Sequence, residues 1–355
     1  LKDQIGFGGQ SIDQGGLRTI AVDIYDASHA AIGPAGLKAT VFVQPDQNDF
    51  ASAIAGDAVT DAIDPDAGDG DIVSFEGYTA DNLLTIDLGL HKAIVTNGDQ
   101  TGSITDVVGF EKVVGSSRDD LIISGGSGPS NIAGGQGADT IAGRADDVVD
   151  YGLEEVFGEH NPQYEAKGIV ADLRLGEVIE SYGDTDIIYR NEIGAGIQNI
   201  VATSKDDIIF GSDQENVIEA GSGDDLIQTG AGDDEVFGGL GDDRIIVGAG
   251  DDTIYGDSRH EAGGRDTFVF EGGFGTDRIE DFEAAAARPA NYNLADTIWG
   301  PSLGGDRIIV RLDQDDHLEG PIEEPGKIVL RKTRQDGQTH SVLVNNTAGL
   351  ITATT

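Results

Sequence analysis

Residues 220–255 decide the fold of this chain. They read AGSGDDLIQ, TGAGDDEVF, GGLGDDRII and VGAGDDTIY, which are four nonapeptides in succession without an insertion or a deletion. Each unit has Gly at its second and fourth positions, Asp at its sixth, and Ile or Val at its eighth. The same register runs back through ATSKDDIIF and GSDQENVIE, so six units cover residues 202–255. Such a fixed period predicts a repeat architecture.

Each unit reads as a tight turn followed by a very short strand. Gly permits the positive φ angles that such turns need, and in a three-residue strand only the central Ile or Val points inward. One apolar residue per strand makes a core only when the units stack in register. Two units then form one coil, and turns 18 residues apart lie above one another. One edge is predicted to stack Asp207, Asp225 and Asp243, and the other Asn216, Asp234 and Asp252.

This stacking brings carboxylates close together. Coils lie about 4.8 Å apart, and at that spacing two carboxylates repel by about 1 kcal/mol even in bulk water. Summed along two edges, this repulsion predicts that the repeats do not fold without cations. Calcium fits the turns because it accepts six to eight oxygen ligands, including backbone carbonyls, whereas magnesium keeps several of its waters.

The pattern G-G-x-G-x-D-x-U-x of these units resembles the calcium-binding RTX (repeats-in-toxin) haemolysin-type repeat, whose fold is the parallel β-roll. An acidic, Gly-rich linker is the alternative, but a linker has no reason to place Ile or Val at every eighth position of nine. The resemblance implies an all-β fold and several bound calcium ions. The predicted metal-binding residues of the block are Asp207, Asn216, Gly221, Gly223, Asp225, Gly230, Gly232, Asp234, Gly239, Gly241, Asp243, Gly248, Gly250 and Asp252.

The repeat extends beyond this block in both directions. GSSRDDLII at 115–123 and GGQGADTIA at 134–142 are further units, and degenerate turns continue after residue 257. GGSGPSNIA, which lies between the two upstream units, has Ser130 where Asp belongs and is predicted to lack a full metal site. The further predicted metal ligands are Asp120, Asp139, Asp147, Asp266 and Asp277.

A second, longer duplication divides the chain. DIVSFEG at 71–77 matches DVVDYGL at 147–153, and LLTIDLG at 83–89 matches GIVADLR at 168–174. We therefore expect two β-roll modules, at 71–146 and 147–257. Residues 1–70 are expected to form a separate region of β-strands, because LRTIAVDIYD and LKATVFVQ alternate apolar and polar residues. Residues 258–355 are expected to form a β cap and a final hairpin, KIVLRK and HSVLVN, around an Asp-Gly turn.

Composition excludes several function classes. The 65 acidic residues against 22 basic ones give a net charge of −43, which repels nucleic acids and anionic membrane surfaces. No apolar run approaches the length of a membrane span, so no membrane insertion is expected. The absence of Cys excludes disulfides and thiolate sites. The basic cluster Arg331, Lys332 and Arg334 is interpreted as a solvated hairpin face, with an anionic surface as the alternative ligand.

No catalytic constellation stands out. His260-Glu261 is not followed by the second His of an HExxH zinc site, no GxSxG elbow occurs, and the six His have no metal-ligand spacing. Acid pairs such as Asp233-Asp234 recur every nine residues, unlike the single carboxylate pair of a glycosidase. In each pair the second Asp is the predicted ligand, and the first is expected to be a solvated turn residue. The expectation is a protein that is not an enzyme.

The RTX resemblance implies secretion by a type I system, and an extracellular or cell-surface location. Within that frame the sequence favours a non-catalytic structural component, such as a surface layer, filament, matrix or adhesin subunit, and a homo-oligomer is a possible assembly. The alternative is the calcium-binding and secretion portion of an RTX exoenzyme whose catalytic domain is absent. The start at Leu1 leaves that alternative open. A pore-forming toxin ranks third, because no apolar membrane-active helix is predicted.

Overall fold

The structure, a computed structural model, describes residues 17–22, 37–42, 50–52, 72–75, 83–97, 100–106, 112–125, 128–153, 168–180, 183–189, 196–257, 264–282, 298–299, 306–311, 317–324, 327–334 and 337–345. The regular secondary structure of these residues is nearly all β-strand, and one helical turn lies at 151–153. Within the described ranges, no helix is long and apolar enough to cross a membrane.

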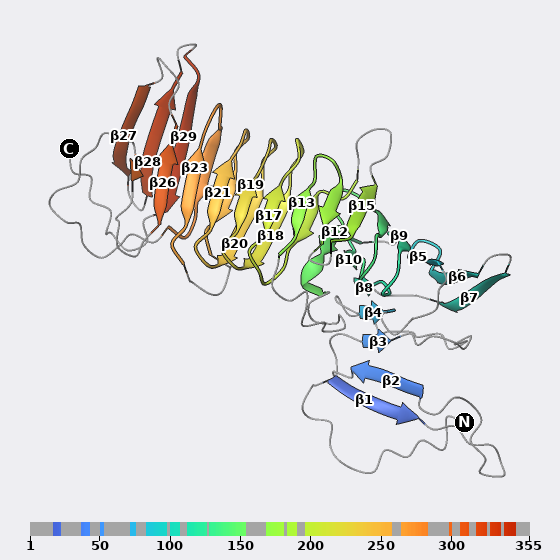
Figure 1. The fold of residues 1–355 in the computed structure, drawn as a ribbon. Coiled ribbons are helices and arrows are strands. Elements are labelled where there is room, and N and C mark those ends of the chain that lie inside the picture. Colours follow the sequence, from blue (N-terminus) through green and yellow to red (C-terminus); the bar gives the residue numbers. More distant parts are fainter. Residues whose placement is uncertain are drawn as a thin grey trace, which may run out of the picture.

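Two long sheets face each other along the molecule (Figure 1). Among the described residues the first sheet has 15 strands, in the spatial order β1 (Leu17–Val22), β2 (Leu37–Phe42), β3 (Phe50–Ser52), β4 (Ile72–Ser74), β8 (Lys112–Val114), β10 (Asn131–Ala133), β12 (Val148–Asp150), β16 (Asn199–Val201), β18 (Val217–Ser222), β20 (Glu235–Leu240), β22 (Thr253–Tyr255), β24 (Thr276–Ile279), β29 (Thr339–Asn345), β28 (Lys327–Thr333) and β27 (His317–Glu324).

The second sheet has 14 strands in the same described part of the chain. Their spatial order is β25 (Ile298–Trp299), β26 (Arg307–Val310), β23 (Thr267–Phe270), β21 (Arg244–Val247), β19 (Leu226–Gln228), β17 (Ile208–Phe210), β13 (Val170–Asp172), β14 (Glu177–Ile179), β15 (Thr185–Tyr189), β11 (Thr140–Ala142), β9 (Asp120–Ile123), β5 (Leu83–Asp87), β6 (Lys92–Asn97) and β7 (Gln100–Asp106).

The chain alternates between the two sheets, so two nonapeptides form one coil. In the second sheet Ile209 pairs with Ile227 and Ile227 with Ile245, in parallel and 18 residues apart. In the first sheet Ile218 pairs with Val236 and Val236 with Ile254, in the same way. The predicted all-β parallel β-roll is therefore confirmed.

The core is a double column of the eighth-position side chains. Each strand of the stacked coils contributes at least one inward residue, and these residues are buried in one continuous cluster. The first sheet supplies Ile132, Val149, Ile200, Ile218, Val236, Ile254 and Ile279, and the second supplies Ile122, Ile141, Ile188, Ile209, Ile227, Ile245, Phe268 and Ile308. Because each strand alone exposes its apolar residue, stability depends on stacking.

Two antiparallel meanders belong to the second sheet, one at its end and one within the parallel stack. In the second sheet β5, β6 and β7 form one, and β13, β14 and β15 form the other. Their first turns match closely: Asp87 accepts a hydrogen bond from Leu90 N, and Asp172 accepts one from Leu175 N. The second meander continues the stack, because β15 pairs in parallel with β11 and β13 pairs in parallel with β17. The division into two modules, with its boundaries, remains a prediction.

Antiparallel strands lie at both ends of the roll. β1 and β2 pair antiparallel, as the alternating pattern of the N-terminal region predicts. The predicted C-terminal hairpin is present as β28 and β29, with Gly337 at φ 81° in its turn. A third strand, β27, extends it. The interpretation of Lys332 as part of a solvated face is wrong, because its side chain is fully buried.

Candidate metal centre

The sixth-position side chains form one column along each edge of the roll. The first-edge column lies in the turns that lead into the second sheet and contains Asp207, Asp225, Asp243, Asp266 and Asp306. The second-edge column lies in the turns that lead into the first sheet and contains Asn216, Asp234, Asp252 and Asp277. All nine side chains are buried, and the predicted stacking of the repeats is confirmed.

Each column is held by a ladder of hydrogen bonds between coils. In the first-edge column, Asp207 N donates to Asp225 Oδ1 at 2.7 Å and Asp225 N donates to Asp243 Oδ1 at 2.9 Å. In the second-edge column, Asp234 N donates to Asp252 Oδ1 at 2.8 Å. The ladder reaches the degenerate turns, since Asp243 N donates to Asp266 Oδ1 and Asp252 N to Asp277 Oδ1. One oxygen of each carboxylate is thus used by the fold itself.

The second oxygen of five of these carboxylates has no hydrogen-bond donor. These atoms are buried, and they are Oδ2 of Asp225, Asp234, Asp243, Asp252 and Asp277. A buried carboxylate oxygen without a donor is costly unless the group is protonated or coordinates a cation. The five residues are therefore the strongest candidates for metal ligands.

The electrostatics of the columns agree with this assignment. The pKa of Asp225 is raised to about 8, chiefly by burial and also by the charges of Asp243 and Asp207, while a backbone hydrogen bond lowers it. Burial likewise raises the pKa of Asp234 to about 8, with Asp252 as a repelling neighbour. Without a cation, therefore, these carboxylates bind protons near neutral pH.

The Gly positions allow the turns to stack closely. Seven of the eight predicted Gly ligands have positive φ, namely Gly221, Gly223, Gly230, Gly232, Gly239, Gly241 and Gly250. A Cβ at Gly239 would lie 1.9 Å from the carbonyl oxygen of Gly221, and a Cβ at Gly248 would lie 1.7 Å from that of Gly230. At these positions Gly is required because carbonyl oxygens of the neighbouring coil occupy the space of a side chain. A Cβ at Gly238 would lie 2.3 Å from the carbonyl oxygen of Gly256 and 2.5 Å from Asp243 Oδ2, so carbonyl and carboxylate oxygens lie close together at this turn.

The fifth-position Asp residues behave differently from the sixth-position ones. Asp224 and Asp233 are exposed, as predicted. Each also accepts a backbone hydrogen bond from the following coil: Asp242 N donates to Asp224 Oδ1 at 2.9 Å, and Asp251 N donates to Asp233 Oδ1 at 2.8 Å. This ladder was not predicted, and it gives these residues a structural role in the turn.

In three turns a hydroxyl residue replaces the second-position Gly and binds the sixth-position side chain. Thr203 donates to Asp207 through both N and Oγ1, at 2.8–3.0 Å. Ser116 does the same for Asp120, and Ser212 N donates to Asn216 Oδ1 at 2.7 Å. These predicted ligands already have protein donors, so they lack the open oxygen that marks the five residues above.

Asp147 is a further predicted ligand with protein partners. Arg144 binds it through the backbone N at 2.7 Å and through Nη2 at 3.0 Å, and Ser130 N donates to its Oδ1 at 2.8 Å. Its pKa is lowered: burial, which raises the pKa, is outweighed by the Arg144 side chain and the other hydrogen bonds. A guanidinium thus supplies the positive charge at this turn.

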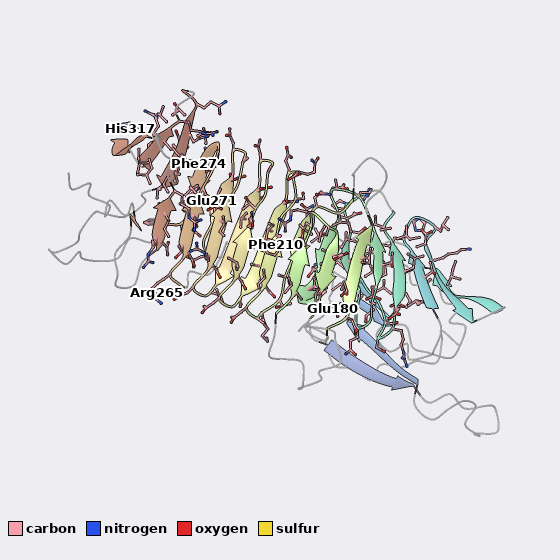
Figure 2. The ribbon with its side chains drawn as sticks, turned by 45° about the horizontal axis from the view of Figure 1, so that its top comes forward. Glu180, Phe210, Arg265, Glu271, Phe274 and His317 are labelled. Carbon is pink, nitrogen blue, oxygen red and sulfur yellow. The ribbon has the colours of Figure 1, made fainter. Side chains whose placement is uncertain are left out.

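A separate acidic cluster lies where the second meander pairs with β11. Carboxylate oxygens of Asp139, Glu180 and Asp186 lie within 4.8 Å of one another, and all three residues are buried. Asp139 N donates to Asp186 Oδ1 at 2.8 Å, and the hydroxyl of Tyr151 donates to Asp186 Oδ2 at 2.9 Å. Glu180 follows β14 and is labelled in Figure 2. These three oxygens could hold a cation between β11 and the meander.

The sequence predicted Asp139 in this cluster and missed the other two residues. Asp186 lies two residues before the buried Ile188, which is the spacing between sixth and eighth positions in a nonapeptide. That spacing was a usable signal, although no Gly-rich turn precedes it. Glu180 had no sequence signal, since the meander alone brings it there.

Comparison with protein families identifies the repeat. The model described as the RTX calcium-binding nonapeptide repeat (4 copies) matches residues 114–149, 193–227 and 228–258. The chain contains RTX calcium-binding repeats. No curated protein matches it in the sequence comparison.

The RTX match includes four of the carboxylates with an open oxygen, namely Asp225, Asp234, Asp243 and Asp252. It ends at residue 258, before Asp266 and Asp277, although the hydrogen-bond ladder continues to both. The donor set of the RTX turns consists of carboxylate and carbonyl oxygens, which suits a hard cation such as calcium. The family match and the donor set together support calcium as the ion of the RTX turns.

Proposed function

We propose that this chain is a secreted, non-catalytic RTX protein that serves as a structural component outside the cell or at its surface, and that it folds when it binds calcium. The supporting observation is the set of five buried carboxylates whose second oxygen has no donor. Buried charges of one sign at the spacing of β coils oppose folding, and a divalent cation shared between coils reverses their effect.

The proposal explains how such a chain could be exported. Below micromolar calcium, as in a cytosol, residues 202–257 are expected to be largely disordered, and at millimolar calcium they are expected to form the roll. An unfolded chain suits a one-step type I export route, which is the route that RTX proteins are known for. Folding would then follow release into a calcium-rich exterior.

Circular dichroism tests the calcium-dependent folding. The far-ultraviolet spectrum should change from coil to β on addition of millimolar calcium, and chelator should reverse the change. Magnesium at the same concentration is the control and should produce a smaller change, because it keeps its waters. A β spectrum that persists unchanged in excess chelator would contradict the proposed calcium-dependent folding.

The structural role is tested separately from folding. Electron microscopy of the purified chain with and without calcium should reveal ordered assemblies in calcium. The competing function, the calcium-binding portion of an RTX exoenzyme, predicts isolated rolls and a catalytic signature in the gene upstream of Leu1. Finding that signature would favour the exoenzyme over the structural component.

A further inference from the structure

A lysine lies buried at the C-terminal end of the roll. Lys332 on β28 has 0% of its side chain exposed, although lysine is almost never fully buried without a partner. Its Nζ donates hydrogen bonds to the carbonyl oxygens of Gly272 and Arg311, both at 3.0 Å. It also lies 5.8 Å from the centroid of the Phe274 ring, within range of a cation–π interaction. The ammonium is therefore held by carbonyl oxygens and an aromatic face.

The two carbonyl groups belong to successive turns of the second edge. Gly272 lies in the turn between β23 and β24, and Arg311 follows β26, the next parallel strand beyond β23. Glu271 and Phe274, which flank Gly272, are labelled at this end of the roll in Figure 2. An ion pair between Arg311 Nη1 and Glu271 Oε2, at 2.6 Å, joins the same two turns. Lys332 thus bridges stacked turns through their carbonyl oxygens, which is the kind of position predicted for calcium in the RTX block.

The second-edge carboxylate column ends at the same place. β29 is the strand beyond β24, and its register pairs Asp277 with Val342. An apolar residue therefore occupies the position where the next carboxylate of the column would stand. Basic groups gather at the turn instead, since a Cβ at Gly273 would lie 3.5 Å from Nη1 of Arg334 and 3.7 Å from the His340 ring.

We infer that the last turn of the second edge is a cation site that the chain fills with its own Lys332 ammonium. The turns at Gly272 and Arg311 and the β27–β29 meander then need no calcium and stay folded when the RTX coils are disordered. This inference rests on the proposed calcium-dependent folding, because it explains why one end of the roll can fold without calcium. It also assigns to the β27–β29 meander the role of a folded end on which the coils can order.

Hydrogen exchange of the full chain, read by mass spectrometry, tests the inference. In chelator, peptides from 327–345 and 270–275 should stay protected while peptides from 217–257 exchange rapidly. In the variant K332M the first two regions should exchange about 10-fold faster or more in chelator, because two buried carbonyl oxygens lose their donor. The matched control is R331M, which removes the same charge from the neighbouring, partly exposed position and should match the unmodified chain.

Three outcomes separate the possible failures. If residues 327–345 exchange in chelator as fast as the coils, or if K332M matches R331M, the inference is overturned. If instead residues 217–257 are equally protected with and without calcium, the proposed function fails while the comparison of K332M with R331M still decides the role of Lys332.

If K332M folds neither in chelator nor in calcium, a second pair of variants tests whether Lys332 fills a cation site. K332E places a carboxylate among the same carbonyl oxygens, and a calcium–oxygen distance of about 2.4 Å bridges the gap left by the shorter side chain. Native mass spectrometry should then count one more calcium ion on K332E than on R331E. Equal ion counts would overturn the assignment of a cation site.

Discussion

At the residue scale, position within the nonapeptide decides what each acidic side chain does. In the turns with Gly at the second position, the sixth-position Asp is buried and keeps one open oxygen, whereas the fifth-position Asp is exposed and supports the next turn. Both kinds carry the same charge and lie next to each other in the sequence. They therefore provide matched pairs in which ligation can be separated from net charge.

The pair Asp233 and Asp234 offers the sharpest comparison. Asp234→Asn keeps an oxygen that can accept the hydrogen bond from Asn216 N but removes the charged ligand, so calcium affinity should fall about 10-fold or more and binding should lose cooperativity. Asp233→Asn also keeps its hydrogen bond to the next coil and should bind calcium nearly as the unmodified chain does. The measurement is isothermal titration with calcium. Coincident curves for the two variants would mean that bulk charge, rather than ligation by Asp234, controls binding.

The same carboxylates make the calcium-free roll sensitive to pH. The pKa is about 8 for Asp225 and Asp234, about 7 for Asp243 and about 6 for Asp252, against about 3.9 in an unfolded chain. Because the folded form binds protons more tightly, its free energy of unfolding rises as pH falls from about 8 toward 4. In chelator, the β signal in circular dichroism should therefore be larger at pH 5 than at pH 8.5.

Calcium binding should depend on pH in the opposite sense. The ligands bind calcium when they are deprotonated, so apparent affinity should decrease from pH 8 to pH 6, with protons released on binding. Titrations in buffers of different ionisation enthalpy measure that release. Affinity that stays constant across this range would show that the buried carboxylates are not the ligands.

At the element scale, the sequence predicted the repeating turns and strands well because the residues that determine each turn and strand lie within a single nonapeptide. The positions of Gly, Asp and Ile or Val fixed the turns, the strand centres and the 18-residue stacking of residues 202–255. The open oxygens also follow a local rule, since a second-position Gly leaves the carboxylate open and Thr203 or Ser116 closes it. The sequence alone did not suggest this rule, because it depends on the hydrogen bonds that the Thr203 and Ser116 hydroxyl groups donate to the carboxylates in the structure.

The elements that the sequence missed depend on contacts between distant segments. Asp139 and Asp186 meet across 47 residues, and Lys332 reaches Gly272 across 60. Neither pair shares a motif, because a meander rather than the nonapeptide period brings the partners together. The burial of Lys332 could not be predicted from its basic neighbours, since the alternation of β28 places Arg331 and Lys332 on opposite faces.

The spacing of the coils gives an element-scale prediction for glycine. Gly239 has φ 111°, and an added Cβ would lie 1.9 Å from Gly221 O, so Gly239→Ala combines backbone strain of about 1–3 kcal/mol with a clash between coils. The melting temperature in saturating calcium should fall by several degrees. Gly128→Ala is the control, because nothing lies within 4 Å of its Cβ, and it should melt like the unmodified chain. Equal melting temperatures would contradict the close approach of the turns.

At the scale of the whole molecule, the roll is an open stack whose ends differ. Figure 1 shows that the two sheets diverge at one end of the roll, where β1 and β2 lie apart from β6 and β7, and that the C-terminal strands lie at the other end. Within the described ranges, the outermost strands are β1 and β7 at one end and β25 and β27 at the other. An outermost strand leaves backbone groups available for pairing with another chain.

Charge should decide whether such pairing occurs. At a net charge of −43, chains repel one another in low salt, and each bound calcium ion removes two negative charges. We therefore predict calcium-dependent self-association through the N-terminal strands and the C-terminal meander. Analytical sedimentation should detect oligomers of the full chain at millimolar calcium and monomers in chelator.

A fragment of residues 71–310 supplies the comparison for this last prediction, because it keeps the RTX coils and lacks β1 to β3 and β27 to β29. If it folds in calcium, it should bind the ions of the coils and remain monomeric. Oligomers of the fragment would place the contact on the coils instead of the ends. A full chain that stays monomeric at millimolar calcium and high protein concentration would remove the support for a filament or layer, and the exoenzyme portion would become the better explanation of a calcium-folded roll.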